Sequence, residues 1–131
     1  MTSSPEAGGL VLGRLVESST DVIVDEISTP VSSDRWSRFN FCRGKKTAQR
    51  KVDKAWAESS GTRIYLGEWH THPEDVPTPS DHDLRDWQRI VQGAQYEQEG
   101  LFFVIVGRQQ MRVWEYAKGS KPTMLQAEER S

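Results

Sequence analysis

Residues 64–75 read Ile64-Tyr-Leu-Gly-Glu-Trp-His-Thr-His-Pro-Glu-Asp75, and this stretch decides the fold. Its apolar beginning predicts a β-strand that runs into the two histidines. The loop that follows contains three prolines and ends at Pro79, so we expect it to be extended. A helix then begins at Ser80 and stops near Gly93, because apolar residues recur there at helical spacing. Its apolar face contains Leu84, Trp87, Ile90 and Val91.

Further strands are predicted on both sides of this segment. Residues 10–16 and 21–27 are apolar runs separated by a turn cluster, which favours a hairpin. Residues 101–106 are continuously apolar, as in a strand buried on both faces. Residues 111–116 alternate between apolar and polar side chains, so we expect them to pair with that strand across a short turn.

A second helix is predicted before the central strand. From Lys45 the apolar residues follow a 3.6-residue period, and Gly61 can end the helix. Its basic residues form a solvated face or, alternatively, guide an acidic substrate. Residues 28–37 before it predict a loop, and residues 39–41 alternate as in a short strand. The apolar face of this helix contains Ala48, Val52, Ala55 and Trp56.

Strands interrupted by helices predict an α/β fold with a single mixed β-sheet and flanking helices. The 131 residues suit one domain, with a core at about residues 6–116 and a polar, frayed tail at residues 117–131.

Composition excludes several classes of protein. The formal charge of −2 gives no general attraction to nucleic acid. The sequence has no apolar run of about 18 residues and no signal-peptide pattern at its start, so we expect a cytoplasmic location and no membrane contact. Cys42 is the single cysteine, which excludes an internal disulfide and a thiolate zinc cluster. We interpret it as a semi-buried cysteine in preference to a nucleophile.

The histidines suggest a metal site. Side chains two apart on a strand share a face at a separation of about 6.5 to 7 Å, so His70 and His72 can bind one ion. Asp83 returns to them through the proline-rich loop and supplies a third ligand. Three protein ligands match the open coordination of a catalytic Zn²⁺ with water in the fourth position. His82 adjoins Asp83, and helical rotation by about 100° makes it a poor candidate for the same ion.

Ser80 and Asp83 also have a purely structural interpretation. Ser80 occupies an N-cap position, and Asp83 lies three residues on, which is the capping-box arrangement with Asp in place of Glu. Taken alone, this pair needs no metal, since an acidic side chain in the first helical turn is favoured by the helix dipole. The histidine pair immediately before it favours the metal interpretation.

The run His70-Thr-His72, seven residues, Ser80, two residues, Asp83 resembles the JAMM signature of the Jab1/MPN metalloprotease family. The segment Glu6-Ala-Gly-Gly-Leu-Val-Leu-Gly13 is similar to the family's early glutamate segment. The resemblance implies the MPN fold, which is cytidine-deaminase-like, and one Zn²⁺ per chain. It also implies that Glu6 moves the proton between the zinc-bound water and the leaving amine, while the Ser80 hydroxyl stabilises the oxyanion.

Two features near this motif require a choice. Glu68 lies on the same strand face as the histidines and is a rival general base, but the resemblance favours Glu6. Family members usually have an element before the glutamate, whereas five residues precede Glu6 here. Without that element, Leu10 and Leu12 would be partly exposed and would invite a partner or a second copy.

The sequence around the motif, from Tyr65 to Trp87, is most similar to bacterial JAMM proteins of antiphage CBASS operons. That resemblance implies an isopeptidase that removes a cGAS-like nucleotidyltransferase from the targets to which a ubiquitin-transfer-like ligase has conjugated it. The extended C-terminal tail of the nucleotidyltransferase would be the part of the substrate that the isopeptidase recognises. The tail could dock as an added strand, with Trp36, Phe39 and Trp69 either lining pockets or packing in the core. One alternative is a JAMM hydrolase that processes a sulfur-carrier or other ubiquitin-like protein. A second is a non-catalytic MPN scaffold.

Overall fold

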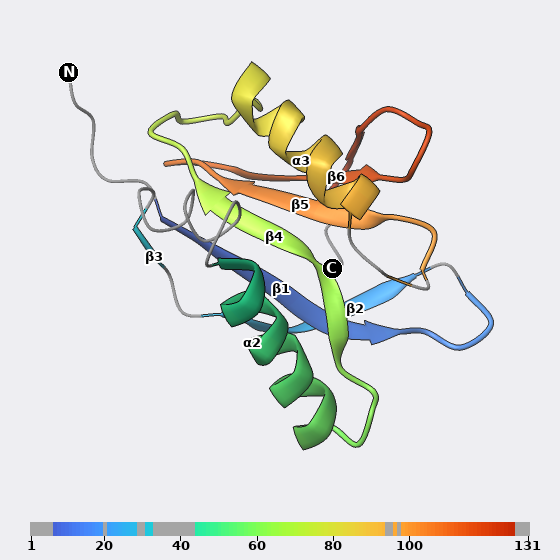
Figure 1. Cartoon of the computed structure of the whole chain (residues 1–131). Helices are drawn as coiled ribbons and strands as arrows, with labels where there is room; N and C mark the ends of the chain where they lie inside the picture. The colour runs from blue at the N-terminus through green and yellow to red at the C-terminus, as the bar shows by residue number, and fades with distance from the viewer. Residues whose placement is uncertain are drawn as a thin grey trace.

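One mixed β-sheet forms the framework of the molecule (Figure 1). The computed structural model describes residues 7–19, 21–28, 31–32, 44–93, 96 and 98–127. Within these residues seven strands form the sheet in the order β2-β1-β4-β5-β6-β7, and β3 pairs with β1. The strands are β1 (Ala7–Leu15), β2 (Val22–Ile27), β3 (Val31–Ser32), β4 (Ile64–Thr71), β5 (Leu101–Val106), β6 (Met111–Tyr116) and β7 (Thr123–Leu125), and the helices are α2 (Gly44–Glu58) and α3 (Asp81–Gly93).

The connections between strands follow the expected pattern. β1 and β2 form an antiparallel hairpin, and so do β5 and β6. β4 and β5 run parallel and are joined through α3. The mixed α/β sheet with flanking helices is therefore confirmed, and the chain segment from β4 to α3 is a crossover connection.

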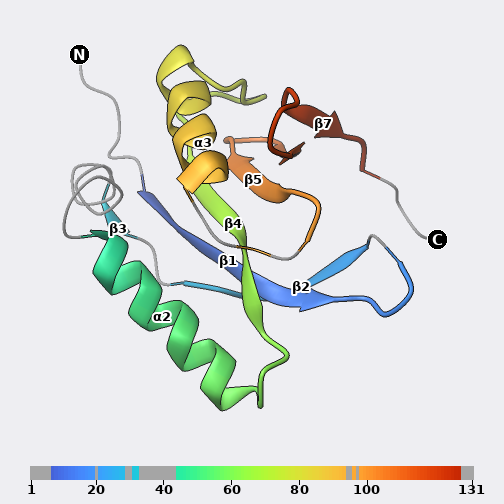
Figure 2. The same ribbon diagram turned by 45° about the vertical axis from the view of Figure 1, so that its right-hand side comes forward.

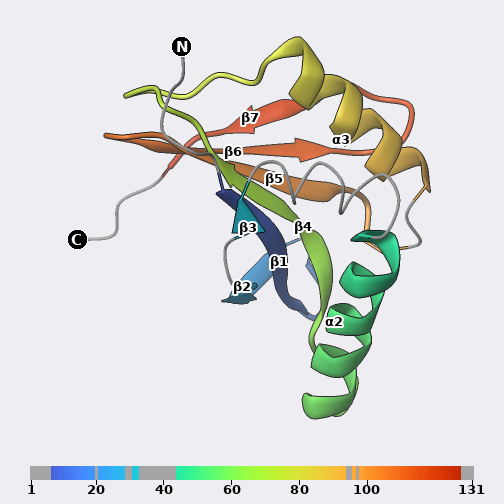
Figure 3. The same ribbon diagram turned by 60° about the vertical axis from the view of Figure 1, so that its left-hand side comes forward.

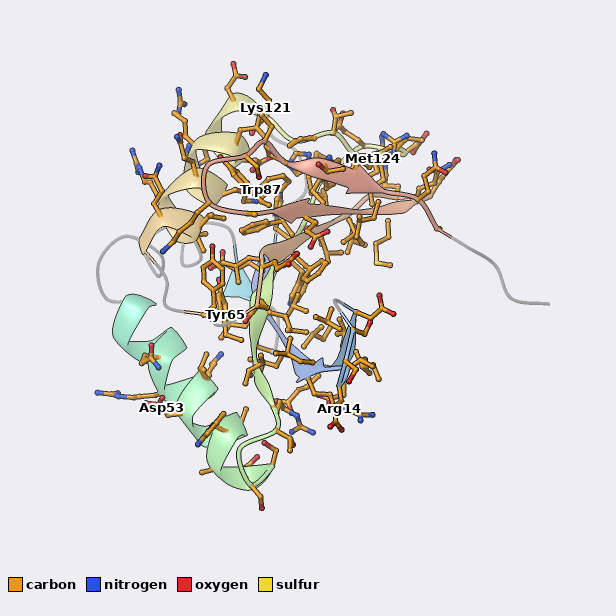
Figure 4. The ribbon with its side chains drawn as sticks, turned by 90° about the vertical axis from the view of Figure 1, so that its right-hand side faces the viewer. Arg14, Asp53, Tyr65, Trp87, Lys121 and Met124 are labelled. Atoms are coloured by element: carbon orange, nitrogen blue, oxygen red, sulfur yellow. The ribbon has the colours of Figure 1, made fainter. Side chains whose placement is uncertain are left out.

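Both helices cover the same face of the sheet (Figure 2, Figure 3). Leu10, Glu68, Phe103 and Trp114 pair in register across four strands, so their side chains share that face. α3 buries Trp87 and Val91 against β5 and β6, while α2 buries Ala55 against β1. Tyr65 packs against both clusters, and Figure 4 shows it on the side of β4 that the helices cover.

A β-bulge in β4 decides which side chains reach this face. Tyr65 pairs with Leu12 and Gly67 pairs with Val11, so Leu66 is an additional residue on β4. The bulge puts Tyr65 and Glu68 on one face, although they are three residues apart. Gly67 has a φ of 154°, and a Cβ there would lie 1.7 Å from the carbonyl oxygen of Phe102. Only glycine fits this close approach of two strands.

The opposite face carries a third apolar cluster, with Val11, Leu66 and Trp69 buried in it. Trp69 is 7% exposed there, which confirms the core interpretation of this side chain over a pocket role. Trp36 and Phe39 lie outside the described residues.

Several expectations are corrected. Residues 123–125 are not a frayed tail but form β7, because their backbone groups pair with the otherwise open edge of β6. Residues 28–37 are not loop throughout, since Val31 and Ser32 pair with β1. Trp56 is 53% exposed, because Ala55 makes the contact of α2 with the sheet. Leu10 and Leu12 are not exposed, because α2 covers them. Residues 39–41 lie outside the described part of the chain.

Candidate metal centre

His70, His72 and Asp83 converge where β4 ends and α3 begins. One potential ligand atom from each residue lies within 4.8 Å of the others. His70 Nε2 is 3.3 Å from Asp83 Oδ1, and His72 Nε2 is 3.0 Å from Asp83 Oδ2. The carboxylate therefore faces both rings, one oxygen to each.

The sheet positions the two histidines. His70 lies between Gly8 of β1 and Ile105 of β5, in the middle of the sheet. The backbone N–H of His72 donates to the carbonyl of Val106 at 3.0 Å, which continues the pairing past the end of β4. The ring of His70 lies 6.5 Å from the ring of Trp87, measured between centroids. Backbone pairing and a buried aromatic neighbour thus hold both imidazoles on the helix-covered face.

A capping box positions Asp83. The N–H of Asp83 donates to Ser80 Oγ at 3.1 Å, and the N–H of Ser80 donates to Asp83 Oδ2 at 2.8 Å. These reciprocal bonds satisfy two backbone donors at the start of α3. The capping interpretation is confirmed, and the same rotamer of Asp83 directs its carboxylate at the histidines.

The loop between the histidines and the helix is attached to the β5–β6 turn. The N–H of Arg108 donates to the carbonyl of Glu74 at 2.6 Å. The N–H groups of Gln109 and Gln110 both donate to the carbonyl of Asp75, at 3.1 and 3.0 Å. A Cβ at Gly107 would lie 2.6 Å from the carbonyl oxygen of Glu74, so the turn approaches the loop closely.

Asp83 is ionised in this environment. Burial by itself raises the pKa of Asp83, but the neighbouring His70, the hydrogen bond from the Ser80 amide and the His72 ring outweigh it. The net result is a pKa well below the usual range for aspartate. The three side chains are 11 to 13% exposed, so the charge is held in a largely enclosed site.

The donor set fits a divalent metal ion. His70 Nε2 is buried and has no hydrogen-bond partner among the described residues, because its contact with Asp83 lacks hydrogen-bond geometry. Two imidazole nitrogens and one carboxylate are ligands that Zn²⁺ accepts in open sites. An ion between these atoms would satisfy the unpartnered nitrogen and balance the carboxylate.

Other candidate residues are placed differently. His82 is 59% exposed and its Nε2 lies 3.2 Å from Asp86 Oδ2, so it is not in the cluster. Glu68 is 8% exposed, and Tyr65 donates its hydroxyl hydrogen to Glu68 Oε2 at 3.2 Å. Glu6 and Cys42 lie outside the described residues.

Sequence reasoning missed two residues that contact candidate site residues, Tyr65 at Glu68 and Glu74 at His72. The sequence pattern predicts Tyr65 only as part of a strand, because the contact of Tyr65 with Glu68 depends on the bulge. Glu74 lies 2.9 Å from the ring of His72, and an acidic residue two positions after a candidate ligand was the available signal.

Comparison with known proteins decides the family. Residues 1–117 match the model of the prokaryotic homologues of the JAB domain. The chain belongs to this family. The resemblance to the Jab1/MPN proteins is therefore confirmed, and the mixed sheet is that of a JAB domain.

Curated relatives of this JAB domain carry enzyme names. A CD-NTase/cGAS isopeptidase of Vibrio cholerae serotype O1 is 38% identical over 105 residues, which cover 80% of this chain and 64% of the relative. A protein of the same name from Pseudomonas aeruginosa is 37% identical over 81% of this chain and 65% of the relative. A probable metalloprotease of Sinorhizobium fredii is 28% identical over 69% of this chain and 55% of the relative. The chain thus spans a little under two thirds of the length of the first two relatives.

Among the described residues, no helix is long and apolar enough to cross a membrane.

Proposed function

We propose that this JAB domain is a zinc-dependent isopeptidase or peptidase. His70, His72 and Asp83 would bind one Zn²⁺, with a water molecule as the fourth ligand. The observation that carries the proposal is the convergence of these three side chains around a buried, unpartnered ring nitrogen. A bound zinc ion supplies a Lewis acid that lowers the pKa of a water molecule and polarises a scissile carbonyl.

Ser80 would stabilise negative charge on the carbonyl oxygen. Its Oγ accepts a hydrogen bond from the N–H of Asp83, which uses one lone pair and leaves the O–H hydrogen available to donate. The hydroxyl is attached to the residue that caps α3, so it is held beside the carboxylate of Asp83. A donor fixed in this way before the reaction is the arrangement that stabilises an oxyanion.

Glu6 is our candidate for the group that takes a proton from the attacking water and delivers it to the leaving amine. It is joined to Ala7, so the two Cα atoms are about 3.8 Å apart. The N–H of Ala7 donates to Oγ1 of Thr71 at 2.9 Å, and Thr71 lies between the two histidines. The position of Ala7, the residue that follows Glu6 in the sequence, supports this candidate.

Glu68 is the rival for this role. The residue is 8% exposed and its carboxylate accepts a hydrogen bond from Tyr65, which favours a structural role over proton transfer. Peptidase assays of Glu6→Gln and Glu68→Gln separate the two. Full activity in Glu6→Gln would reject Glu6.

The names of the relatives support a substrate class. We infer that the bond cleaved follows the extended C-terminal tail of a cGAS-like nucleotidyltransferase, attached to its targets by a ubiquitin-transfer-like ligase. Release of the nucleotidyltransferase from its targets would regulate antiphage defence in the bacterial cytoplasm.

The test is cleavage of a fusion in which a nucleotidyltransferase tail precedes a reporter protein. The zinc-loaded domain is expected to cut directly after the last residue of the tail, and Asp83→Asn is expected not to cut. Cleavage of a sulfur-carrier fusion instead would reassign the substrate. The zinc content of the gently purified protein tests the non-catalytic scaffold. A catalytic site holds one ion, so less than about a tenth of a zinc ion per chain would support the scaffold.

A further inference from the structure

Glu74 contacts His72 on the side of the ring that faces away from the proposed metal. Its Oε1 lies 2.9 Å from Nδ1 of His72, while Nε2 of the same ring lies 3.0 Å from Asp83 Oδ2. The ring of His72 is therefore held between two carboxylates, and only one of them belongs to the candidate metal centre.

The contact determines which ring nitrogen can bind a metal. An ionised carboxylate is only an acceptor, so the hydrogen in this contact belongs to Nδ1. In a neutral imidazole, the lone pair is then on Nε2, which is the nitrogen that faces His70 and Asp83. The bond to Glu74 also restricts rotation of the ring about its χ2 angle.

Glu74 is itself fixed in place. The same Oε1 accepts the N–H of Thr78 at 3.3 Å, which links the two ends of the proline-rich loop. The backbone carbonyl of Glu74 accepts the N–H of Arg108 from the β5–β6 turn at 2.6 Å. The bond from Thr78 holds the carboxylate, and the bond from Arg108 holds the backbone that carries it, although the side chain is 45% exposed.

We propose that Glu74 is a positioning residue for the metal ligand His72. It acts through the imidazole and touches neither the ion nor the substrate. The inference rests on the proposed zinc site, since it assigns a second layer of support to one of its ligands. Partners of this kind orient ligating histidines and raise their basicity.

The neighbouring residue provides a matched control. Asp75 is on the same loop, carries the same charge and has a 55% exposed side chain. Its carboxylate lies 3.2 Å from Nε of Arg108 and not against a histidine, and its backbone carbonyl, which holds the turn, is unchanged by substitution. Asp75→Ala therefore removes a loop charge without removing the contact to His72.

The experiment measures zinc dissociation constants of the full chain by competition with a chromophoric chelator. Glu74→Ala is expected to weaken zinc binding by about 10- to 100-fold. Glu74→Gln keeps an oxygen that can accept a hydrogen bond from Nδ1 of His72. Its loss of zinc affinity should therefore be clearly smaller than that of Glu74→Ala. Asp75→Ala should bind as the parent protein does. Thermal unfolding of the metal-free variants checks that all four proteins are folded.

The zinc-loaded proteins give a second readout by proton NMR. The Nδ1 proton of His72 should be protected from exchange in the parent protein and in Asp75→Ala, and lost to exchange in Glu74→Ala. Equal zinc affinity in Glu74→Ala and Asp75→Ala, or equal loss in Glu74→Gln and Glu74→Ala, would overturn the positioning role. Failure of the parent protein to bind zinc would instead reject the proposed function.

Discussion

Asp83 combines two roles, as a cap of α3 and as a candidate metal ligand. One oxygen of its carboxylate caps α3 through the amide of Ser80 and also faces His72, while the other faces His70. Capping bonds are local and depend only on a spacing of three residues. The histidines lie on a strand that precedes the helix. A local motif therefore fixes the rotamer that a tertiary site requires.

Replacing Asp83 by Asn should separate these roles. The amide keeps an oxygen that can accept from Ser80, so α3 and the fold should remain, but the negative charge is lost. We expect zinc affinity to fall by more than the roughly 10- to 100-fold that supporting residues contribute. Competition with a chelator measures the affinity, and circular dichroism checks the fold.

His82→Ala is the control for this substitution, because His82 is adjacent, exposed and paired with Asp86 outside the cluster. Unchanged zinc binding in Asp83→Asn, or equal losses in both variants, would contradict the ligand assignment.

The bulge in β4 decides the contact between Tyr65 and Glu68. If β4 were regular along the same sequence, the alternation of side chains would place Tyr65 on the face opposite Glu68 and the histidines. The bulge requires a close approach between Gly67 and Phe102.

We expect Gly67→Ala to destabilise the protein by at least about 2 kcal/mol, because its Cβ would overlap the backbone of β5. Gly93→Ala, at the end of α3 and with nothing within 4 Å of the added carbon, should change stability little. Urea unfolding of the metal-free proteins compares them. A Gly67→Ala protein as stable as Gly93→Ala would show that the strands can separate to admit a side chain.

At the scale of the whole molecule, Tyr65 connects the two halves of the helix-covered core. It packs against the cluster under α3 and the cluster under α2, and donates to the buried Glu68. Burial raises the pKa of Tyr65 well above its ordinary value, and the negative charge of Glu68 raises it further. The unfolded chain therefore loses this proton at a lower pH than the folded protein does.

The pH dependence of stability follows from this difference. The contribution of Tyr65 is fully present below about pH 10, the ordinary pKa of tyrosine, and declines as the pH rises above it. Tyr65→Phe should lose about 1–3 kcal/mol at neutral pH, because buried Glu68 loses a donor. The free energy of unfolding of Tyr65→Phe should also decline less steeply at high pH than that of the parent protein.

Urea unfolding between about pH 8 and pH 11, which brackets that pKa, tests this expectation. Tyr96, whose pKa is also raised by burial, is retained in both proteins. If the free energy of unfolding declines equally with pH in the parent protein and in Tyr65→Phe, Tyr65 is not the source of the pH dependence.

Local patterns in the chain were sufficient for much of the fold. The 3.6-residue period predicted both helices, the turn residues predicted both hairpins, and the spacing from Ser80 to Asp83 predicted the cap. The spacing from His70 to Asp83 also indicated which side chains converge. Each of these depends on residues close in the sequence, whose geometry is set by backbone hydrogen bonding and side-chain alternation.

Other features were decided only when distant surfaces met. Tyr65 reaches Glu68 because a bulge forms against β1, Trp56 is exposed because Ala55 makes the contact of α2, and residues 123–125 become a strand because β6 has an open edge. The periodicity of apolar residues indicates which side of a helix or strand is apolar. It does not indicate which other element of the fold covers that side, since burial depends on residues far apart in the sequence.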